Sequence, residues 1–181
     1  MSVIMFSGVH GVGKGFFLDK VKDSLRHYAV YSASKLIEKY QPSTDAGYKK
    51  VSDVNHNQEV LIKAIEEETR LNGDDCIMDG HLCIFNARGE VERVPESFFV
   101  KAQIAGIILL QDEPKVISER IYQRDSAQIS IEDIRKMQDE EEMYANELKE
   151  KFQIDYRIIT HECTGEQLEK MLREMGGKRD A

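Results

Sequence analysis

A glycine-rich segment near the start of the chain carries a lysine in a pattern that binds phosphate groups. Residues 8–15 read GVHGVGKG, which follows G-x-x-x-x-G-K-[ST] up to its last position. Glycines let successive backbone N–H groups turn inward around phosphate oxygens, and Lys14 adds a mobile positive charge. The residues predicted to hold the phosphates of a nucleotide are Gly8, Val9, His10, Gly11, Val12, Gly13, Lys14, Gly15 and Phe16.

The last position of this motif departs from the pattern. Gly15 stands where a Ser or Thr hydroxyl usually contacts magnesium, and the neighbouring Phe16 and Phe17 cannot replace that hydroxyl. Mg²⁺ commonly keeps several waters, so the nucleotide, water and another carboxylate can hold the ion without this ligand. We therefore expect a modified site, and a relic that no longer transfers phosphate is the alternative.

Two further candidates follow a short apolar segment, Cys76–Asp79, which we predict to be a strand. In an open parallel sheet, ligands bind beyond the carboxyl ends of the strands. Asp79 is therefore a candidate catalytic residue that holds magnesium or orients an acceptor hydroxyl; a turn carboxylate is the alternative. His81 can bond a phosphate or an acceptor nucleotide, or be a structural histidine.

Two arginines, Arg120 and Arg124, are spaced for one face of a helix that also carries Ile117 and Ile121. Arginine beside apolar residues needs a charged partner, and the transferring phosphoryl group is one. The alternative partner is the acidic run at 139–142, which we predict to be a solvated helix face.

Apolar strand-like segments alternate with helical patterns along the chain, which predicts a parallel sheet covered on both faces. The predicted strands are 2–6, 28–31, 76–79, 105–110 and 157–160. The predicted helices begin near residues 13, 33, 51, 112, 131 and 165. Residues 42–50 read as a loop, and residues 81–95 as an excursion with a small hairpin.

Length and composition set further limits. The 181 residues fit one domain, and a net charge of −8 disfavours binding to a nucleic-acid backbone. Cys76, Cys83 and Cys163 fit neither a disulfide framework nor a zinc site, so we expect buried reduced thiols. No cleavable leader or membrane-spanning run is visible, which favours a cytoplasmic protein without membrane contact. Assembly with copies of itself is left open.

The order of these motifs resembles the nucleoside monophosphate kinases, specifically the archaeal-type adenylate kinases. GVHGVGKG is similar to their phosphate loop, MDGH at 78–81 to their strand-end Asp-x-His, and AGIILLQDEPKVISERI to their fourth strand and arginine-bearing helix. QRD at 123–125 and SIEDI at 130–134 resemble a later signature. The stretch between Arg120 and Arg124 is a few residues shorter than in that family, which bears on lid closure and on the substrate.

The resemblance implies a P-loop NTPase fold of the α/β class, with a five-stranded parallel sheet over residues 1–175. Substrate and lid excursions would lie at about 33–72, 81–95 and 120–130, with a flexible tail at 176–181. It implies ATP and Mg²⁺ as cofactors, and Ser34 and Gln58, together with His81, at the acceptor site.

From these residues we predict an ATP-dependent phosphotransferase acting on a small nucleotide or nucleoside-like acceptor. Lys14 and the loop amides would hold the donor phosphates, and Arg120 and Arg124 would neutralise the transferred group. A nucleotide-binding regulatory module and a slow ATPase are the two alternatives. A GTP-specific switch is disfavoured, because no N-K-x-D motif is present.

Overall fold

An all-parallel sheet of five strands, in the order β2-β3-β1-β6-β7, forms the centre of the molecule. The computed structural model describes residues 2–40, 54–72, 75–85 and 89–176. The strands are β1 (Val3–Ser7), β2 (Tyr28–Ser32), β3 (Asp75–Asp79), β6 (Ile104–Leu110) and β7 (Asp155–Ile159). All five residues of β1 are buried, as expected for a central strand that is covered on both faces.

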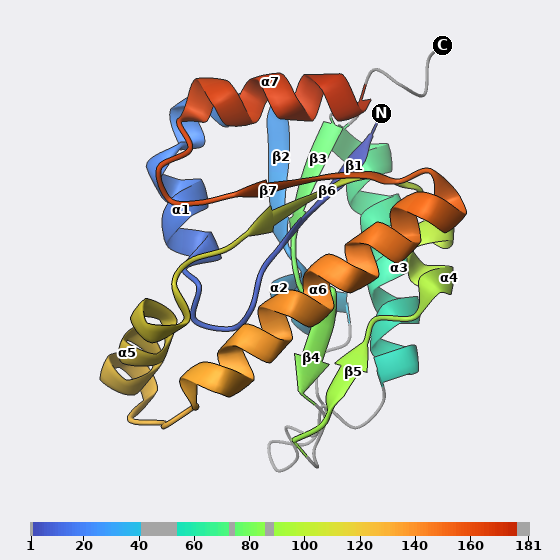
Figure 1. Cartoon of the computed structure of the whole chain (residues 1–181). Coiled ribbons are helices and arrows are strands. Elements are labelled where there is room, and N and C mark those ends of the chain that lie inside the picture. The colour runs from blue at the N-terminus through green and yellow to red at the C-terminus, as the bar shows by residue number, and fades with distance from the viewer. Residues whose placement is uncertain (1, 41–53, 73–74, 86–88, 177–181) are drawn as a thin grey trace.

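Helices cover both faces of this sheet (Figure 1). The short helices α1 (Lys14–Lys20) and η1 (Lys22–Leu25) lie with α7 (Gly165–Gly176) on one face. The other face is covered by α3 (Val54–Asn72), α4 (Glu96–Lys101) and α6 (Ile131–Phe152). Two further helices, α2 (Ala33–Tyr40) and α5 (Pro114–Asp125), follow directly after β2 and β6, at the carboxyl edge of the sheet.

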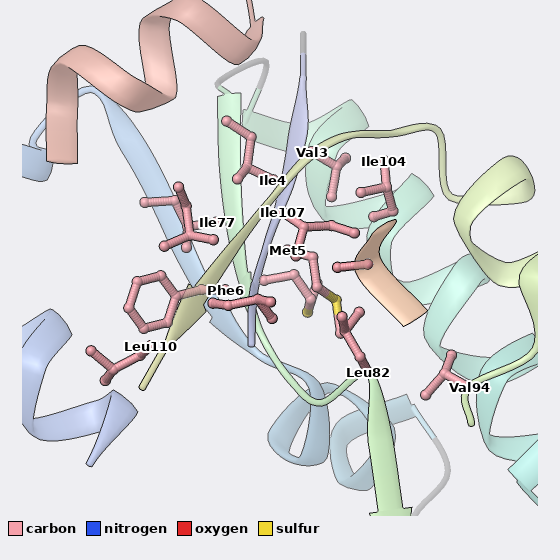
Figure 2. Packing of buried hydrophobic residues seen from close by; sticks show 14 of the residues in the cluster. Val3, Ile4, Met5, Phe6, Ile77, Leu82, Val94, Ile104, Ile107 and Leu110 are labelled. Carbon is pink, nitrogen blue, oxygen red and sulfur yellow. The ribbon is translucent and has the colours of Figure 1, made fainter. Parts of the chain in front are cut away.

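The core is built around β1 and its two neighbours in the sheet (Figure 2). Phe6 pairs with Asp79 on β3 and with Ile108 on β6, so the end of β1 meets the ends of both strands. A two-stranded hairpin, β4 (Cys83–Phe85) and β5 (Val91–Arg93), extends from the carboxyl end of β3. Buried Leu82 and Val94 fix its base, where the N–H of Val94 donates to the Leu82 carbonyl at 2.8 Å.

The sequence predicted this architecture and most of its elements. The α/β class, the five parallel strands and the hairpin in the excursion are confirmed. The helix at 96–101 was not predicted, because a six-residue helix gives too few turns for a periodic signal. The loop expected at 42–50 and the tail after residue 176 lie outside the described residues.

One expectation about α6 is wrong. The acidic run 139–142 was expected to face solvent, but Glu141 is only 2% exposed. Its position falls on the same helical face as Ile134, Met137 and Leu148, so the helix turns this carboxylate inward.

Within the described residues, no helix is long and apolar enough to cross a bilayer. The three cysteines are free thiols, as expected. Cys76 and Cys83 are buried, and burial raises the pKa of each to about 12. Cys163 is only partly buried.

Candidate phosphate-binding site

The glycine-rich loop connects the carboxyl end of β1 to the start of α1, in the middle of the sheet edge. Gly13, the residue before α1, has φ 96°, a backbone conformation that side-chain-bearing residues rarely adopt. A Cβ on Gly8 would lie 2.6 Å from the carbonyl oxygen of Leu110, so the loop passes directly over the end of β6. These two glycines let the chain turn tightly enough to present its N–H groups and the N-terminus of α1 to one point.

Lys14 folds back under this loop. It is 8% exposed, and its Nζ donates to the Gly8 carbonyl at 2.8 Å. The same Nζ lies 4.0 Å from Oδ1 of Asp79 and 3.5 Å from both ring nitrogens of His81. The structure therefore brings together three residues predicted for the site, from the start of α1 and the end of β3.

Burial and neighbouring charges together shift the pKa values of the groups in this cluster. Burial lowers the pKa of Lys14, while the negative charges of Asp79 and Glu141 raise it. Burial likewise raises the pKa of Asp79, and the charge of Lys14 opposes that shift. Burial, with the positive charge of Lys14, lowers the pKa of His81 to about 3. His81 is therefore neutral near pH 7 and offers one donor and one acceptor nitrogen.

Behind the cluster, Glu141 of α6 links the phosphate loop to the segment after β3. Its Oε1 accepts from the hydroxyl of Ser7 at 2.8 Å and from the N–H of Leu82 at 3.2 Å. The Ser7 oxygen also accepts from the Leu82 N–H at 2.9 Å. Because Ser7 precedes Gly8 and Leu82 follows His81, this one carboxylate fixes the segments on both sides of Lys14.

On the opposite side of the loop, two side chains converge on the carbonyl oxygen of Val12. Nη1 of Arg120 donates to this oxygen at 3.0 Å, and Nε2 of His161 lies 2.7 Å from it. Arg120 also pairs with Asp112, at 2.8 Å. The alternative partner considered for Arg120, the acidic run on α6, is not the one it contacts; its partner is the carboxylate that follows β6.

Arg124 lies one turn further along α5 and is more exposed, at 57% of its side chain. Its Nη2 donates to Oδ2 of Asp125 at 2.6 Å and to Nε2 of His10 at 2.5 Å. Since His10 belongs to the glycine-rich loop, both arginines of α5 contact the loop from the same helix. Neither points into the core with Ile117 and Ile121, which are buried.

The variant position Gly15 faces open space. Apart from its chain neighbours and the backbone of its own helix, a Cβ built on Gly15 would meet no atom of the described residues within 4 Å. Phe17 is fully buried and stacks on Phe6, with ring centroids 5.7 Å apart, whereas Phe16 is 73% exposed. Phe17 therefore does not occupy the space beside Gly15.

The predicted acceptor residues lie on α2 and α3, at the other side of Asp79. Ser34 is exposed near the start of α2, and a Cβ on Gly80 would lie 3.6 Å from the Cβ of the adjacent Ala33. Gln58 on α3 has a buried Oε1 that finds no hydrogen-bond partner among the described residues. An unsatisfied buried acceptor costs about 1–3 kcal/mol.

Only one carboxylate of the cluster is available to a metal ion. No group of three or more His, Cys, Asp or Glu side chains that could hold a metal occurs in the described part of the chain. Asp79 is 24% exposed, whereas Glu141 is occupied by its hydrogen bonds to Ser7 and Leu82. One carboxylate fits Mg²⁺, which proteins often bind through one or two carboxylates plus the phosphates of the substrate.

Sequence reasoning missed three residues of this site: Asp112, Glu141 and His161. Asp112 and His161 each come two residues after a strand, β6 and β7, where the rule applied to Asp79 would have found them. Glu141 occupies an apolar position of its helix, and a carboxylate in that position is the signal of a buried partner.

A glycine-rich loop between a central parallel strand and a helix, with a buried lysine at the helix start, defines a P-loop nucleotide-binding fold. A family model described as an AAA domain matches residues 7–138, and the chain belongs to this family of P-loop NTPase-like domains. No curated protein matches the sequence.

Solved structures with the same fold cover nearly the whole chain. The tunicamycin resistance protein of Deinococcus radiodurans aligns over 97% of this chain and 95% of its own, with TM-score 0.60 and 17% identity. A sugar kinase from Janibacter sp. HTCC2649 aligns over 98% and 95%, with TM-score 0.52 and 12% identity. A gluconokinase from Sinorhizobium meliloti 1021 aligns over 98% and 93%, with TM-score 0.50 and 10% identity. The chain therefore has a kinase-like P-loop fold.

Proposed function

We propose that this protein is an ATP-dependent phosphotransferase that moves the γ-phosphoryl group to a small nucleotide or nucleoside-like acceptor. The observation that carries the proposal is the position of Lys14, which lies buried under the glycine-rich loop and 4.0 Å from Asp79. A lysine at the start of the helix after the loop, close to a carboxylate at the end of the neighbouring strand, can hold a phosphoryl group and position it for transfer.

In this proposal the loop amides and Lys14 bind the β- and γ-phosphates of ATP. Lys14 moves from the Gly8 carbonyl to the phosphates, which are stronger acceptors for an ammonium group. Asp79 holds Mg²⁺, directly or through water, or orients the acceptor. Arg120 and Arg124, which already contact the loop, neutralise charge on the group in transfer.

The acceptor would bind between the end of β3 and helices α2 and α3. Neutral His81 faces Lys14 and can bond a phosphate or a hydroxyl. The unsatisfied Oε1 of Gln58 would accept an N–H or O–H of the acceptor, and exposed Ser34 would add a hydroxyl. The resemblance to archaeal-type adenylate kinases favours a nucleotide acceptor, whereas two of the fold neighbours are named as a gluconokinase and a sugar kinase.

The experiment is a product screen with purified protein, ATP and Mg²⁺. The acceptors are the nucleosides, the nucleoside monophosphates, gluconate, simple sugars and tunicamycin, and the products are separated by anion exchange. A new phosphorylated acceptor supports the proposal. The Lys14→Ala variant, purified in the same way, controls for a contaminating kinase. Lys22→Ala is the matched control, because Lys22 is exposed and forms an ion pair with Asp19, outside the site.

A second candidate is favoured by one observation, the glycine in place of the metal-binding hydroxyl. A regulatory module would keep the loop for affinity and bind ATP without turnover; a slow ATPase would release inorganic phosphate without any acceptor. If the protein binds ATP tightly at saturating magnesium but phosphorylates no acceptor, one of these two functions would replace the kinase proposal.

A further inference from the structure

The side chain of His161 is held in place by its surroundings. It follows β7 and is 20% exposed, with its ring 5.8 Å from Phe17 at an interplanar angle of 75°. Phe17 in turn stacks on Phe6 of β1. Edge-to-face contact with a core aromatic fixes the plane of the imidazole, and with it the direction of its N–H.

That direction is toward the phosphate loop. Nε2 of His161 lies 2.7 Å from the carbonyl oxygen of Val12. A carbonyl oxygen only accepts hydrogen bonds, so Nε2 must carry the proton and donate it. The ring lies close against the next residue as well, since a Cβ on Gly13 would be 3.1 Å from Cε1 of His161.

The peptide between Val12 and Gly13 therefore has its carbonyl held from outside the loop. The described chain contains no cis peptide bonds, and in a planar trans peptide the C=O and the N–H point in opposite directions. Holding the Val12 oxygen toward His161 and Arg120 thus turns the Gly13 N–H away from them. Gly13, with φ 96°, has no side chain that would restrict its rotation.

We propose that His161 is a positioning residue of the phosphate loop, which holds the Val12 carbonyl outward and so aims the Gly13 N–H at the phosphates of the donor. The inference rests on the ATP-binding half of the proposed function. It assigns a role to the loop after β7, from which no site residue was predicted. Arg120 shares the Val12 oxygen but is more exposed than His161, at 41% against 20% of the side chain, and belongs to the helix above the loop.

The test compares two ligands, ATP and inorganic tripolyphosphate, by calorimetric titration. His161→Phe keeps the ring against Phe17 but removes the donor, whereas His161→Gln keeps an N–H donor without the ring. We expect His161→Phe to weaken the binding of both ligands about tenfold, which is the effect of losing one hydrogen bond to the loop. His161→Gln should recover most of that affinity. His27→Ala, an exposed histidine outside the site, is the control and leaves both affinities unchanged.

Three outcomes would overturn the inference. Unchanged affinity of His161→Phe for tripolyphosphate means that the loop does not depend on this histidine. A loss for ATP alone means that His161 contacts the base or sugar instead. Equal losses in the Phe and Gln variants mean that a restored N–H donor does not recover the affinity, so the hydrogen bond to the Val12 carbonyl is not what positions the loop. If wild-type protein binds neither ligand, the proposed function fails as well, which separates that failure from the other three.

A measurement on the wild-type protein keeps the inference testable even if the variants do not fold. Nitrogen-15 spectra of labelled histidine distinguish the two imidazole tautomers at neutral pH. The geometry requires the proton on Nε2 of His161, and a ring with its proton on Nδ1 would contradict it.

Discussion

The two sides of Lys14 are built from different parts of the chain. The donor side is made of backbone: the loop between β1 and α1, with its Val12 carbonyl held by Arg120 and His161. The proposed acceptor side would be made of single side chains from separate elements, with His81 after β3, Ser34 on α2 and Gln58 on α3.

This difference decides how closely each side of Lys14 defines its ligand. Backbone N–H groups bind any polyphosphate in the same way, so the donor side identifies a class of ligand and leaves its identity open. Side chains on different elements read one particular shape. If the proposed acceptor site is correct, the buried Oε1 of Gln58 would disfavour a ligand that cannot donate to it.

Replacing Lys14 should remove the activity of the donor side. We expect Lys14→Ala to lower turnover about a thousandfold and to weaken ATP binding, because the loop loses its only buried cation among the described residues. Steady-state kinetics and calorimetry measure the two effects, and circular dichroism checks the fold. Lys22→Ala should behave as wild type; an equal loss in both variants would remove Lys14 from the site.

The sequence revealed the donor side for a physical reason. A loop that binds phosphate with its amides needs glycines and a lysine at consecutive positions, so the signal at 8–15 is local. Ser34 and Gln58 were predicted only from the family resemblance, because neither residue type is distinctive by itself. The apolar position of Glu141 signals a buried partner but does not name it, because Ser7 and Leu82 are 59 residues or more away in the chain. Arg120 was predicted on α5, but its partner Asp112 was not, because a carboxylate between a strand and a helix also reads as a cap.

Removing the buried carboxylate behind the site should destabilise the protein. Glu141→Ala leaves the Ser7 hydroxyl and the Leu82 N–H without their shared acceptor, which should lower the free energy of unfolding by about 3 kcal/mol. Urea unfolding measures it, and the exposed neighbour Glu142→Ala should change it by less than about 0.5 kcal/mol. Equal stabilities of the two variants would show that the Glu141 bonds contribute nothing.

The same carboxylate predicts a pH dependence. Burial raises the pKa of Glu141 above its ordinary value of 4.5, so the folded state binds a proton more tightly than the unfolded state. The contribution of this group to stability should therefore fall as the pH rises from 4.5 through its folded pKa. As the pH rises over that window, the unfolding free energy of the wild type should fall relative to that of Glu141→Gln. A constant difference between the two would contradict the raised pKa.

Arg120 should affect transfer more than binding. Its charge matters most while the phosphoryl group is in transfer, and the Val12 oxygen keeps His161 as a donor when Arg120 is removed. We expect Arg120→Ala to lower kcat about a hundredfold with a smaller change in ATP affinity. Arg135→Ala on the exposed face of α6 is the control. Full activity of Arg120→Ala would reduce this arginine to a structural partner of Asp112.

Gly15 should have the smallest effect, confined to the metal. Open space beside Gly15 accommodates a hydroxyl, so Gly15→Ser should lower the magnesium concentration needed for half-maximal activity by a few-fold. Gly15→Ala adds the Cβ without the hydroxyl and should leave the magnesium dependence unchanged. A fall in ATP binding in both variants would mean that the space is used by the bound nucleotide.

The central claim is that the donor phosphates bind in the backbone loop and not on the acceptor side. Nitrogen-15 and proton spectra of the labelled protein, recorded during titration with ATP and Mg²⁺, test this residue by residue. We predict the largest shifts for the amides of Gly11, Gly13, Lys14 and Gly15, whose N–H groups would meet the phosphates. The amides of Ser34 and Gln58 should move little until an acceptor is added. Shifts confined to α2 and α3, with the loop amides unmoved, would contradict the account.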